Sequence, residues 1–242
     1  MRLSKRIYKI AELVNEGNSV ADIGTDHGYV PMLLMKEGKS PRAIMSDISA
    51  GSLSKAKETF ELTGLTNKVS DSDFRVGDGL STIKEGEVDE VIIAGLGGHT
   101  IADILSSDKK KAKSFKRLVL QPRKYSGSLR YYLYTNGWDI ESENLAPEGK
   151  FVCEIITAVP SKDKHREPPY PEDDIRWKYP AELFESDPEL ARKRVSYKIG
   201  SIDEQIGNLM MSKTAKDDDI DRLKHDKSYL AELIGNSEIK SK

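Results

Sequence analysis

The stretch Ser19-Val-Ala-Asp-Ile-Gly-Thr-Asp-His-Gly-Tyr-Val-Pro31 decides the fold of this 242-residue chain. It begins with a mostly apolar segment, 20–23, as a buried strand does, and continues after Gly24 into an apolar helical run from Met32 to Met35. A glycine between a strand and a helix lets the backbone approach a ligand at the strand's carboxyl end. The stretch therefore predicts the first strand, turn and helix of a doubly wound α/β domain. A tight turn without a ligand is the alternative.

Two carboxylates, Asp22 and Asp26, flank this glycine. They would repel the pyrophosphate of a dinucleotide, which such a turn normally holds with backbone amides and a helix N-terminus. S-Adenosylmethionine instead carries a sulfonium and an ammonium group, and both are attracted by carboxylates. The loop therefore favours S-adenosylmethionine over a nicotinamide dinucleotide.

The composition indicates a soluble protein with one α/β domain and a smaller appendage. Hydrophobic residues make up 37% of the chain, which supports a sizeable core, and the formal net charge of −2 does not decide for or against nucleic acid. No run is long enough to span a bilayer and the N-terminus lacks a signal-type apolar core, so we expect a cytoplasmic location. The single cysteine, Cys153, excludes an intrachain disulfide and is expected in the core.

Two further acids follow predicted strands. Asp47 ends a strand over 42–47, about 20 residues beyond the glycine turn, where an acid accepts hydrogen bonds from ribose hydroxyls; the alternative is that it caps the next helix. Asp78 ends a strand over 74–78, where doubly wound S-adenosylmethionine enzymes place an acid for the adenine amino group; a simple Asp-Gly turn is the alternative. Since parallel strands end at one edge of a sheet, we expect these acids to converge with those of the first loop.

The later segments complete the sheet. Strands are predicted over 88–94, before Gly95-Leu96-Gly97-Gly98, and over 118–120, before Gln121-Pro122, and an antiparallel pair over 138–145 and 151–159. Together they predict a Rossmann-like class I methyltransferase sheet of seven mostly parallel strands over residues 1–160. Residues 161–183, rich in Pro, Lys, Asp and Glu, are predicted to be a linker.

Residues 184–242 have apolar side chains at three- and four-residue steps, in two blocks separated by a polar break at 216–219. This pattern predicts a C-terminal antiparallel coiled-coil hairpin of two α-helices. Gripping RNA, dimerisation and acting as a packing strut are all open functions for it.

From Lys109 to Arg130 the chain has nine lysines and arginines and no acid. A solvated helix face usually mixes the two signs, so the run favours a phosphate-contacting surface, part of it near the end of the fifth strand. The tyrosines at 125, 131 and 132 either stack on bases or pack. The predicted RNA-contacting residues are Lys109, Lys110, Lys111, Arg123, Lys124 and Arg130, with Arg192 and Arg194 from the hairpin.

Four motifs resemble the TrmK-type bacterial tRNA (adenine-N1)-methyltransferases, which act on the adenosine at position 22 of the D-arm. They are Asp22-Ile-Gly-Thr-Asp-His-Gly-Tyr-Val-Pro31, Ile93-Ala-Gly-Leu-Gly-Gly98, Leu120-Gln-Pro122, and Gly137-Trp138 before a final strand. The resemblance covers nearly the whole chain, because the family also pairs a Rossmann-like domain with a C-terminal coiled-coil hairpin. It implies transfer of the sulfonium methyl to adenine N1, with S-adenosylmethionine as cofactor and tRNA as partner.

The predicted site follows from the loops and from this resemblance. Asp26 is expected to stabilise the positive charge of the methylated adenine or to take a proton from its exocyclic amine. His27 and Tyr29 are expected to orient or stack on a flipped base, with packed rings as the alternative. The predicted cofactor contacts are Asp22, Gly24, Thr25, Asp47, Ile48, Asp78, Gly79, Ala94 and Gly95. We expect no metal, no membrane association, and a monomer or weak homodimer.

Other functions remain open on the sequence. A methyltransferase for another RNA position fits the same residues, whereas a small-molecule substrate would not need nine cations around the site. A catalytically inactive interaction protein is disfavoured because the glycine turn and all the strand-end acids are present. A nicotinamide-dependent oxidoreductase is disfavoured by the acidic loop. The sequence also lacks the Asn-Pro-Pro-aromatic signature after the fourth strand, which fits methylation of a ring nitrogen better than of the exocyclic amine.

Overall fold

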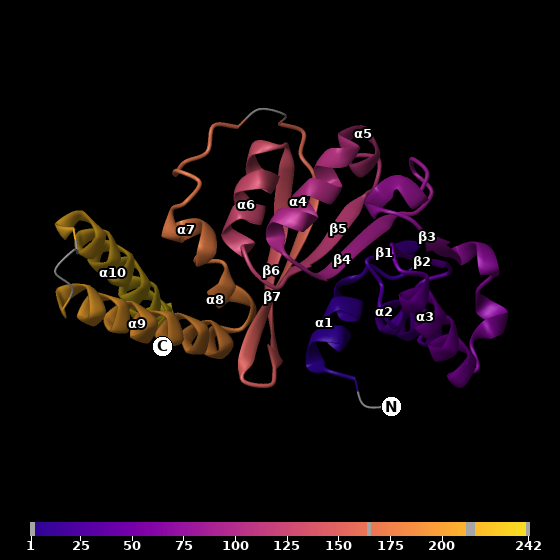
Figure 1. The fold of residues 1–242 in the computed structure, drawn as a ribbon, viewed down its shortest axis with the longest axis horizontal. Helices are drawn as coiled ribbons and strands as arrows, with labels where there is room; N and C mark the ends of the chain where they lie inside the picture. Colours follow the sequence, from indigo (N-terminus) through magenta and orange to yellow (C-terminus); the bar gives the residue numbers. More distant parts are fainter. Residues whose placement is uncertain (1–2, 164–165, 212–215, 241–242) are drawn as a thin grey trace.

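A seven-stranded sheet in the order β3-β2-β1-β4-β5-β7-β6 organises the chain (Figure 1). The computed structural model describes residues 3–163, 166–211 and 216–240, the last four by their backbone alone. The strands are β1 (Val20–Ile23), β2 (Ala43–Asp47), β3 (Phe74–Val76), β4 (Glu90–Leu96), β5 (Arg117–Pro122), β6 (Trp138–Glu148) and β7 (Phe151–Pro160). Strands β1 to β5 are parallel, and β7 is antiparallel to both β5 and β6. The predicted methyltransferase sheet is therefore confirmed.

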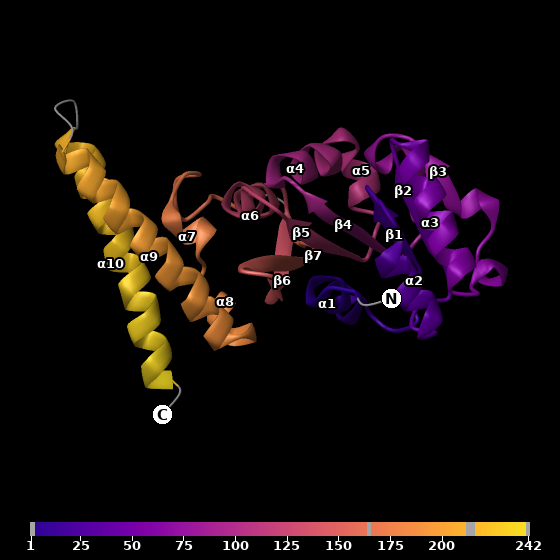
Figure 2. The same ribbon diagram turned by 60° about the horizontal axis from the view of Figure 1, so that its bottom comes forward.

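Helices cover both faces of the sheet (Figure 2). One face carries α1 (Lys5–Leu13), α2 (Tyr29–Lys36) and α3 (Ala50–Leu62), and the other carries α4 (Gly98–Ser107), α5 (Lys109–Ala112) and α6 (Ser126–Thr135). Short 3-10 turns lie at η1 (Thr66–Lys68), η2 (Asp71–Asp73) and η3 (Gly79–Thr82). Successive side chains of a strand point to opposite faces, so Val20 joins the core under α1–α3 whereas Ala21 joins the core under α4–α6.

Four helices follow the sheet: α7 (Ile175–Lys178), α8 (Leu183–Ser186), α9 (Pro188–Met211) and α10 (Asp217–Lys240). The two long helices lie side by side (Figure 2), with Val195 and Ile202 of α9 packed against Leu230 and Leu233 of α10. The two helices predicted for this region are therefore present and pack against each other. The predicted break at 216–219 ends three residues too late, because α10 already begins at Asp217. The three aspartates at 217–219 suit the positive end of the helix dipole.

Part of the predicted linker, 161–183, packs onto the sheet domain. The Trp177 ring of α7 is 8% exposed and lies edge-on to Tyr131, with Tyr134 and Tyr170 also in contact. Tyr132 packs beside the core under α4–α6. For the tyrosines at 125, 131 and 132, the sequence left stacking on bases and packing as alternatives. The structure shows that Tyr131 and Tyr132 are packing residues.

No helix in the described part of the chain is both long and apolar enough to cross a membrane.

Candidate active site

The loop after β1 forms one wall of a cavity at the carboxyl edge of the sheet. Gly24 has φ +79°, and a Cβ there would lie 3.4 Å from the Leu96 side chain, so a larger residue would strain the turn. The amides of Gly24 and Thr25 both donate to the Ser46 carbonyl, at 2.8 and 3.0 Å. These bonds tie the loop to β2 and fix its backbone.

The cavity has a volume of about 340 Å³, within the range of small-molecule sites. It brings together eight of the residues predicted from the sequence: Asp22, Gly24, Thr25, Asp26, His27, Tyr29, Ala94 and Gly95. The RNA-contacting candidate Arg123 lines it too, as do Arg6 and Leu96, which the sequence analysis did not propose. The ends of β1, β4 and β5 thus build one site. Asp47 and Asp78, which we expected to converge with Asp22 and Asp26, do not line it.

The other predicted cofactor residues do not line this cavity. Asp47 is the last residue of β2, and Ile48, which follows it, is 73% exposed. Ser49, whose Oγ accepts the Ser52 amide, is the N-cap of α3, so Asp47 is not the helix cap that the alternative interpretation required. Asp78 and Gly79 line a separate cavity of about 570 Å³ beside α4.

Asp22 is a buried acid that is poorly solvated. Its side chain is buried, and burial raises its pKa from 3.8 to about 6, with the Asp47 charge acting in the same direction. Thr25 Oγ1 donates to its carboxylate at 2.6 Å and the Arg6 charge also opposes the rise. A buried, underbonded carboxylate of this kind attracts a cationic ligand.

Asp26 is exposed and is held by two basic side chains. Lys55 Nζ donates to one carboxylate oxygen at 2.9 Å, and His27 Nδ1 lies 2.8 Å from the other. The hydrogen bond from Lys55 holds the pKa of Asp26 below its usual value, so the carboxylate is charged at neutral pH. The His27 ring stacks on Tyr29 with centroids 5.0 Å apart. The three predicted catalytic residues thus form one cluster with Lys55.

Arg6 of α1 lines the cavity on the side of the β6–β7 hairpin. Its Nε donates to Glu148 at 2.9 Å and its Nη1 to Gln121 Oε1 at 3.0 Å. The sequence signal was weak, because Arg6 looked like one of several cations on the polar face of an amphipathic helix. Cys153 donates to the other Glu148 oxygen at 3.4 Å and is half-buried; burial raises its pKa to about 11, so it stays a thiol.

The loops after β4 and β5 are joined at the rim of the site. The Arg123 amide donates to the Leu96 carbonyl, and the Gly98 amide donates to the Lys124 carbonyl, both at 2.8 Å. A Cβ on Gly98 would lie 2.2 Å from the Tyr125 carbonyl oxygen, so only glycine allows this approach. Tyr125 has φ +60° and its exposed ring stacks on His99 at 4.3 Å. A strained aromatic residue at a site rim is typical of a functional position.

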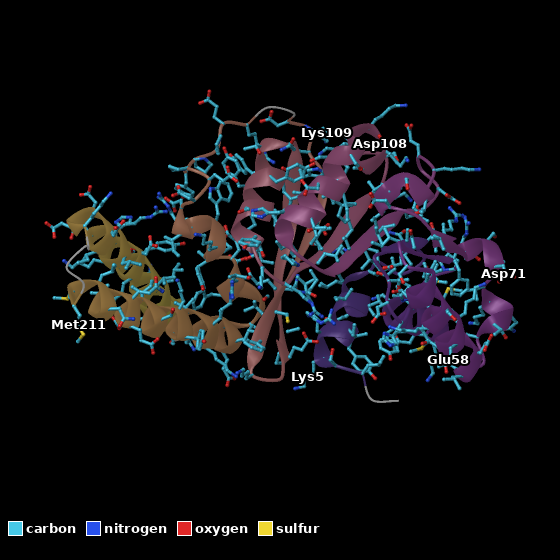
Figure 3. The ribbon with its side chains drawn as sticks, viewed as in Figure 1. Lys5, Glu58, Asp71, Asp108, Lys109 and Met211 are labelled. Atoms are coloured by element: carbon cyan, nitrogen blue, oxygen red, sulfur yellow. The ribbon has the colours of Figure 1, made fainter. Side chains whose placement is uncertain are left out.

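The predicted basic surface is divided between two edges of the sheet. Lys109, Lys110 and Lys111 belong to α5, which precedes β5, and Lys110 pairs with Glu85 before β4. They therefore lie at the amino end of β5, away from the cavity around Gly24, and their contact with RNA stays a prediction. Figure 3 shows Lys109 on the opposite side of the molecule from Lys5 of α1. Arg123 and Lys124 follow β5 and are exposed at the ligand edge.

Arg130 is also misassigned by the sequence analysis. It is 1% exposed and pairs with Glu143 at 2.6 Å and with Glu154 at 2.5 Å. Burial opposes its charge, but the two carboxylates hold its pKa above the ordinary value. Arg130 therefore joins α6 to β6 and β7 and cannot reach RNA. On α9, Arg194 pairs with the same Glu154, and Arg192 is half-buried.

The described residues contain no group of three or more His, Cys, Asp and Glu side chains arranged to hold a metal ion.

The chain is similar to known methyltransferases. Residues 3–156 match a family model described as a methyltransferase domain. The chain is 37% identical over 158 residues to the tRNA (adenine(22)-N(1))-methyltransferase of Bacillus subtilis, an alignment that covers 65% of each chain. The chain thus spans just under two thirds of that curated relative's length in sequence.

Two solved structures resemble the chain over nearly its whole length. The B. subtilis m1A22 tRNA methyltransferase TrmK matches with a TM-score of 0.78 and 28% identity, over 96% of this chain and 99% of that one. Streptococcus pneumoniae Sp1610, solved in complex with S-adenosyl-L-methionine, matches with a TM-score of 0.73 and 25% identity, over 96% and 100%. The chain therefore belongs to the methyltransferase-domain family and, within it, to the TrmK family.

Proposed function

We propose that this protein transfers a methyl group from S-adenosylmethionine to N1 of the adenine at position 22 in the D-arm of tRNA. The observation that carries the proposal is the cavity around Gly24, at the carboxyl ends of β1, β4 and β5, with the carboxylates of Asp22 and Asp26 in its wall. The B. subtilis relative has this activity in its name, and the S. pneumoniae structure holds this cofactor. A tRNA substrate implies a location in the cytoplasm. A monomer or weak homodimer stays a prediction.

The residues of the cavity fit the cofactor. Asp22 is a buried carboxylate with an elevated pKa, and a cationic group beside it would relieve the cost of its charge. Gly24 and Gly95 leave the cavity wall without side chains, so a ligand can approach the backbone. Asp47 accepts the Ser49 amide through Oδ1 at 2.7 Å and can offer Oδ2 to ribose hydroxyls. We keep Asp78 as the proposed acceptor for the adenine amino group of the cofactor. The remaining proposed cofactor contacts are Thr25, Ile48, Gly79 and Ala94.

When bound, S-adenosylmethionine supplies a methyl group on a positively charged sulfur. Adenine N1 already has an available lone pair, so the protein's main tasks are to align the two reactants and to exclude water. Holding reactants together in this way is worth ~7–11 kcal/mol of the barrier. The adenine gains positive charge as the N1–C bond forms, and a fixed carboxylate nearby stabilises that charge.

Asp26 is the proposed carboxylate. Its lowered pKa makes it a poor proton acceptor but a persistent negative charge, so charge stabilisation is favoured over proton removal. Lys55 holds one of its oxygens and thereby fixes its position. His27 and Tyr29, stacked on each other, offer an aromatic surface to a base that has left its helical stack. Tyr125 and His99 offer a second such surface at the rim.

A methyl-transfer assay tests this function. Wild-type protein is incubated with labelled S-adenosylmethionine and an unmodified tRNA transcript, and the digested RNA is analysed by mass spectrometry. The expected product is N1-methyladenosine. The same assay with Gly24→Val, which fills the turn, is expected to give no product and no cofactor binding. N6-methyladenosine or a methylated pyrimidine in the digest would overturn the proposed chemistry.

A further inference from the structure

A second groove, separate from the active-site cavity, lies between the β6–β7 turn and α9. This hairpin groove has a volume of about 620 Å³ and is lined by Lys150, Phe151, Val152, Tyr179, Lys193, Arg194, Tyr197, Lys198 and Ser201. It contains four cationic side chains and no acidic one among its lining residues. None of these residues except Arg194 was proposed to contact RNA from the sequence.

Three of the four cations that line the hairpin groove lack an ion pair among the described residues. Lys150, Lys193 and Lys198 have no ion pair in the described part of the chain, whereas Arg194 pairs with the buried Glu154. In a chain whose acids and bases are nearly balanced, three unpaired lysines around one groove form a local positive field. This field attracts an anion with several charges in a row.

Two large rings stand exposed beside these lysines. Phe151 is 64% exposed and Tyr197 is 81% exposed. Tyr197 stands one helical turn beyond Lys193 and one turn before Ser201, so the three occupy one face of α9. Cations interleaved with exposed rings are the combination that binds a nucleic acid backbone and stacks its unpaired bases. An acidic peptide would use the lysines but would have little use for the rings.

The β6–β7 hairpin connects this groove to the active site. Glu148 is paired with Phe151 across the hairpin, and Glu148 accepts the Arg6 Nε that lines the cofactor cavity. Lys150 and Phe151, at the turn, line the groove. An RNA seated in the hairpin groove would therefore lie next to the rim of the cavity in which its base reacts.

We propose that the hairpin groove binds a segment of the tRNA substrate, with phosphates on Lys150, Lys193 and Lys198 and an unpaired base on Phe151 or Tyr197. The proposal rests on the proposed function, because it names where the RNA is held while adenine 22 reacts. It makes the β6–β7 turn and α9 parts of one substrate-binding surface. The lysines act in binding and not in the chemical step.

The first test compares two triple variants of the full chain. Lys150→Ala/Lys193→Ala/Lys198→Ala removes the charge of the groove, and Lys36→Ala/Lys68→Ala/Lys84→Ala removes the same charge from exposed lysines outside both cavities. Filter binding measures Kd for tRNA at several salt concentrations. We expect the groove variant to bind at least tenfold more weakly at 0.1 M salt. Its slope of log Kd against log salt should fall by about 2 to 3, the loss of three phosphate contacts. The control variant should bind as the wild type does.

The second test concerns the rings and the chemistry. Phe151→Ala/Tyr197→Ala is expected to raise Kd for tRNA at least fivefold, and Phe151→Trp/Tyr197→Phe, which keeps both rings, to restore it. All groove variants should keep the wild-type Kd for S-adenosylmethionine and, at saturating tRNA, a kcat within twofold of the wild type.

The outcomes separate the two proposals. A wild-type protein that methylates tRNA while the groove and control variants bind it equally well overturns the groove proposal and leaves the function standing. A groove variant that loses kcat but keeps its tRNA affinity also overturns the groove proposal. A wild-type protein that binds S-adenosylmethionine but neither binds nor methylates tRNA overturns the proposed function.

Discussion

Asp22 of β1 and Asp26 of the loop after it have opposite pKa shifts because their surroundings differ. Asp22 is buried, and burial raises its pKa to about 6; Asp26 is exposed, and the Lys55 hydrogen bond lowers its pKa. The first is suited to meet a cation from the cofactor, and the second to remain charged beside the reacting base. Environment, more than residue type, assigns the two roles.

Asp22 should make stability depend on pH. Its folded pKa of about 6 lies above the unfolded 3.8, so the folded state loses stability as pH rises through this interval, by roughly 3 kcal/mol. Asp22→Asn keeps an acceptor for Thr25 but carries no charge. We expect urea unfolding to show the variant more stable by about that amount at pH 7.5 and nearly equal to wild type at pH 4. An equal difference at both pH values would contradict the buried charge.

A substitution at Asp26 tests whether this residue acts in catalysis or in cofactor binding. Asp26→Asn should lower kcat by about 100-fold, the typical effect of removing one electrostatic stabiliser, while Kd for S-adenosylmethionine stays within threefold. Lys55→Met, which removes the partner at 2.9 Å but keeps the carboxylate, serves as control and should lose less. Calorimetry and single-turnover assays give the two quantities. Parallel loss of binding and turnover would make Asp26 a cofactor ligand instead.

At the level of elements, the loops after β4 and β5 act as one unit because Gly98 touches the Tyr125 backbone. Gly98→Ala must push the two loops apart, and overpacking of this kind costs about 1–3 kcal/mol. Gly97 has φ −71°, and a Cβ there would lie 3.6 Å from Thr100 Oγ1, so Gly97→Ala is a matched control. We expect Gly98→Ala to lose over tenfold in methyl transfer and to melt earlier, and Gly97→Ala to change little. Similar losses in both variants would show that the contact is unimportant.

The sequence predicted these elements well where one local pattern decides them. The glycine turn after the first apolar run located the end of β1, the glycines after the fourth run placed the end of β4 two residues early, and the apolar periodicity located α9 and α10. It failed where the partner is distant in sequence. The lysines at 109–111 and the arginines at 123 and 130 belong to one basic run, but they occupy the amino edge, the ligand edge and the protein interior respectively. A run of like charges in the sequence does not show whether each residue lies at the amino edge of the sheet, at the ligand edge or in the interior.

The candidate site was predictable to a similar extent. Loops that end neighbouring parallel strands must meet, so eight predicted catalytic and cofactor residues share one cavity with the RNA candidate Arg123. Arg6 and Lys55 could not be identified, because each lies on a helix surface among other cations and is selected only by how that helix packs. The same holds for Trp177, whose burial against three tyrosines depends on tertiary contact within a segment that has the composition of a linker.

At the level of the whole molecule, we keep the division into 1–160, 161–183 and 184–242 as a proposal. Leu230 is fully buried in the α9–α10 seam, so Leu230→Ala should weaken it by about 2–5 kcal/mol. Leu62, 80% exposed, gives the control Leu62→Ala, expected within 0.5 kcal/mol of wild type. Hydrogen exchange should become faster in α9 and α10 but not in the sheet. Equal acceleration in β1 and β4 would mean a single cooperative unit.

The proposed reaction is methylation of one adenine of tRNA in the cavity around Gly24. The most direct measurement uses two transcripts of one tRNA, with adenosine or guanosine at position 22, and labelled S-adenosylmethionine. We expect methyl transfer to the adenosine transcript alone, with N1-methyladenosine mapped to position 22. Equal transfer to both transcripts, or none to either while the cofactor binds, would contradict it.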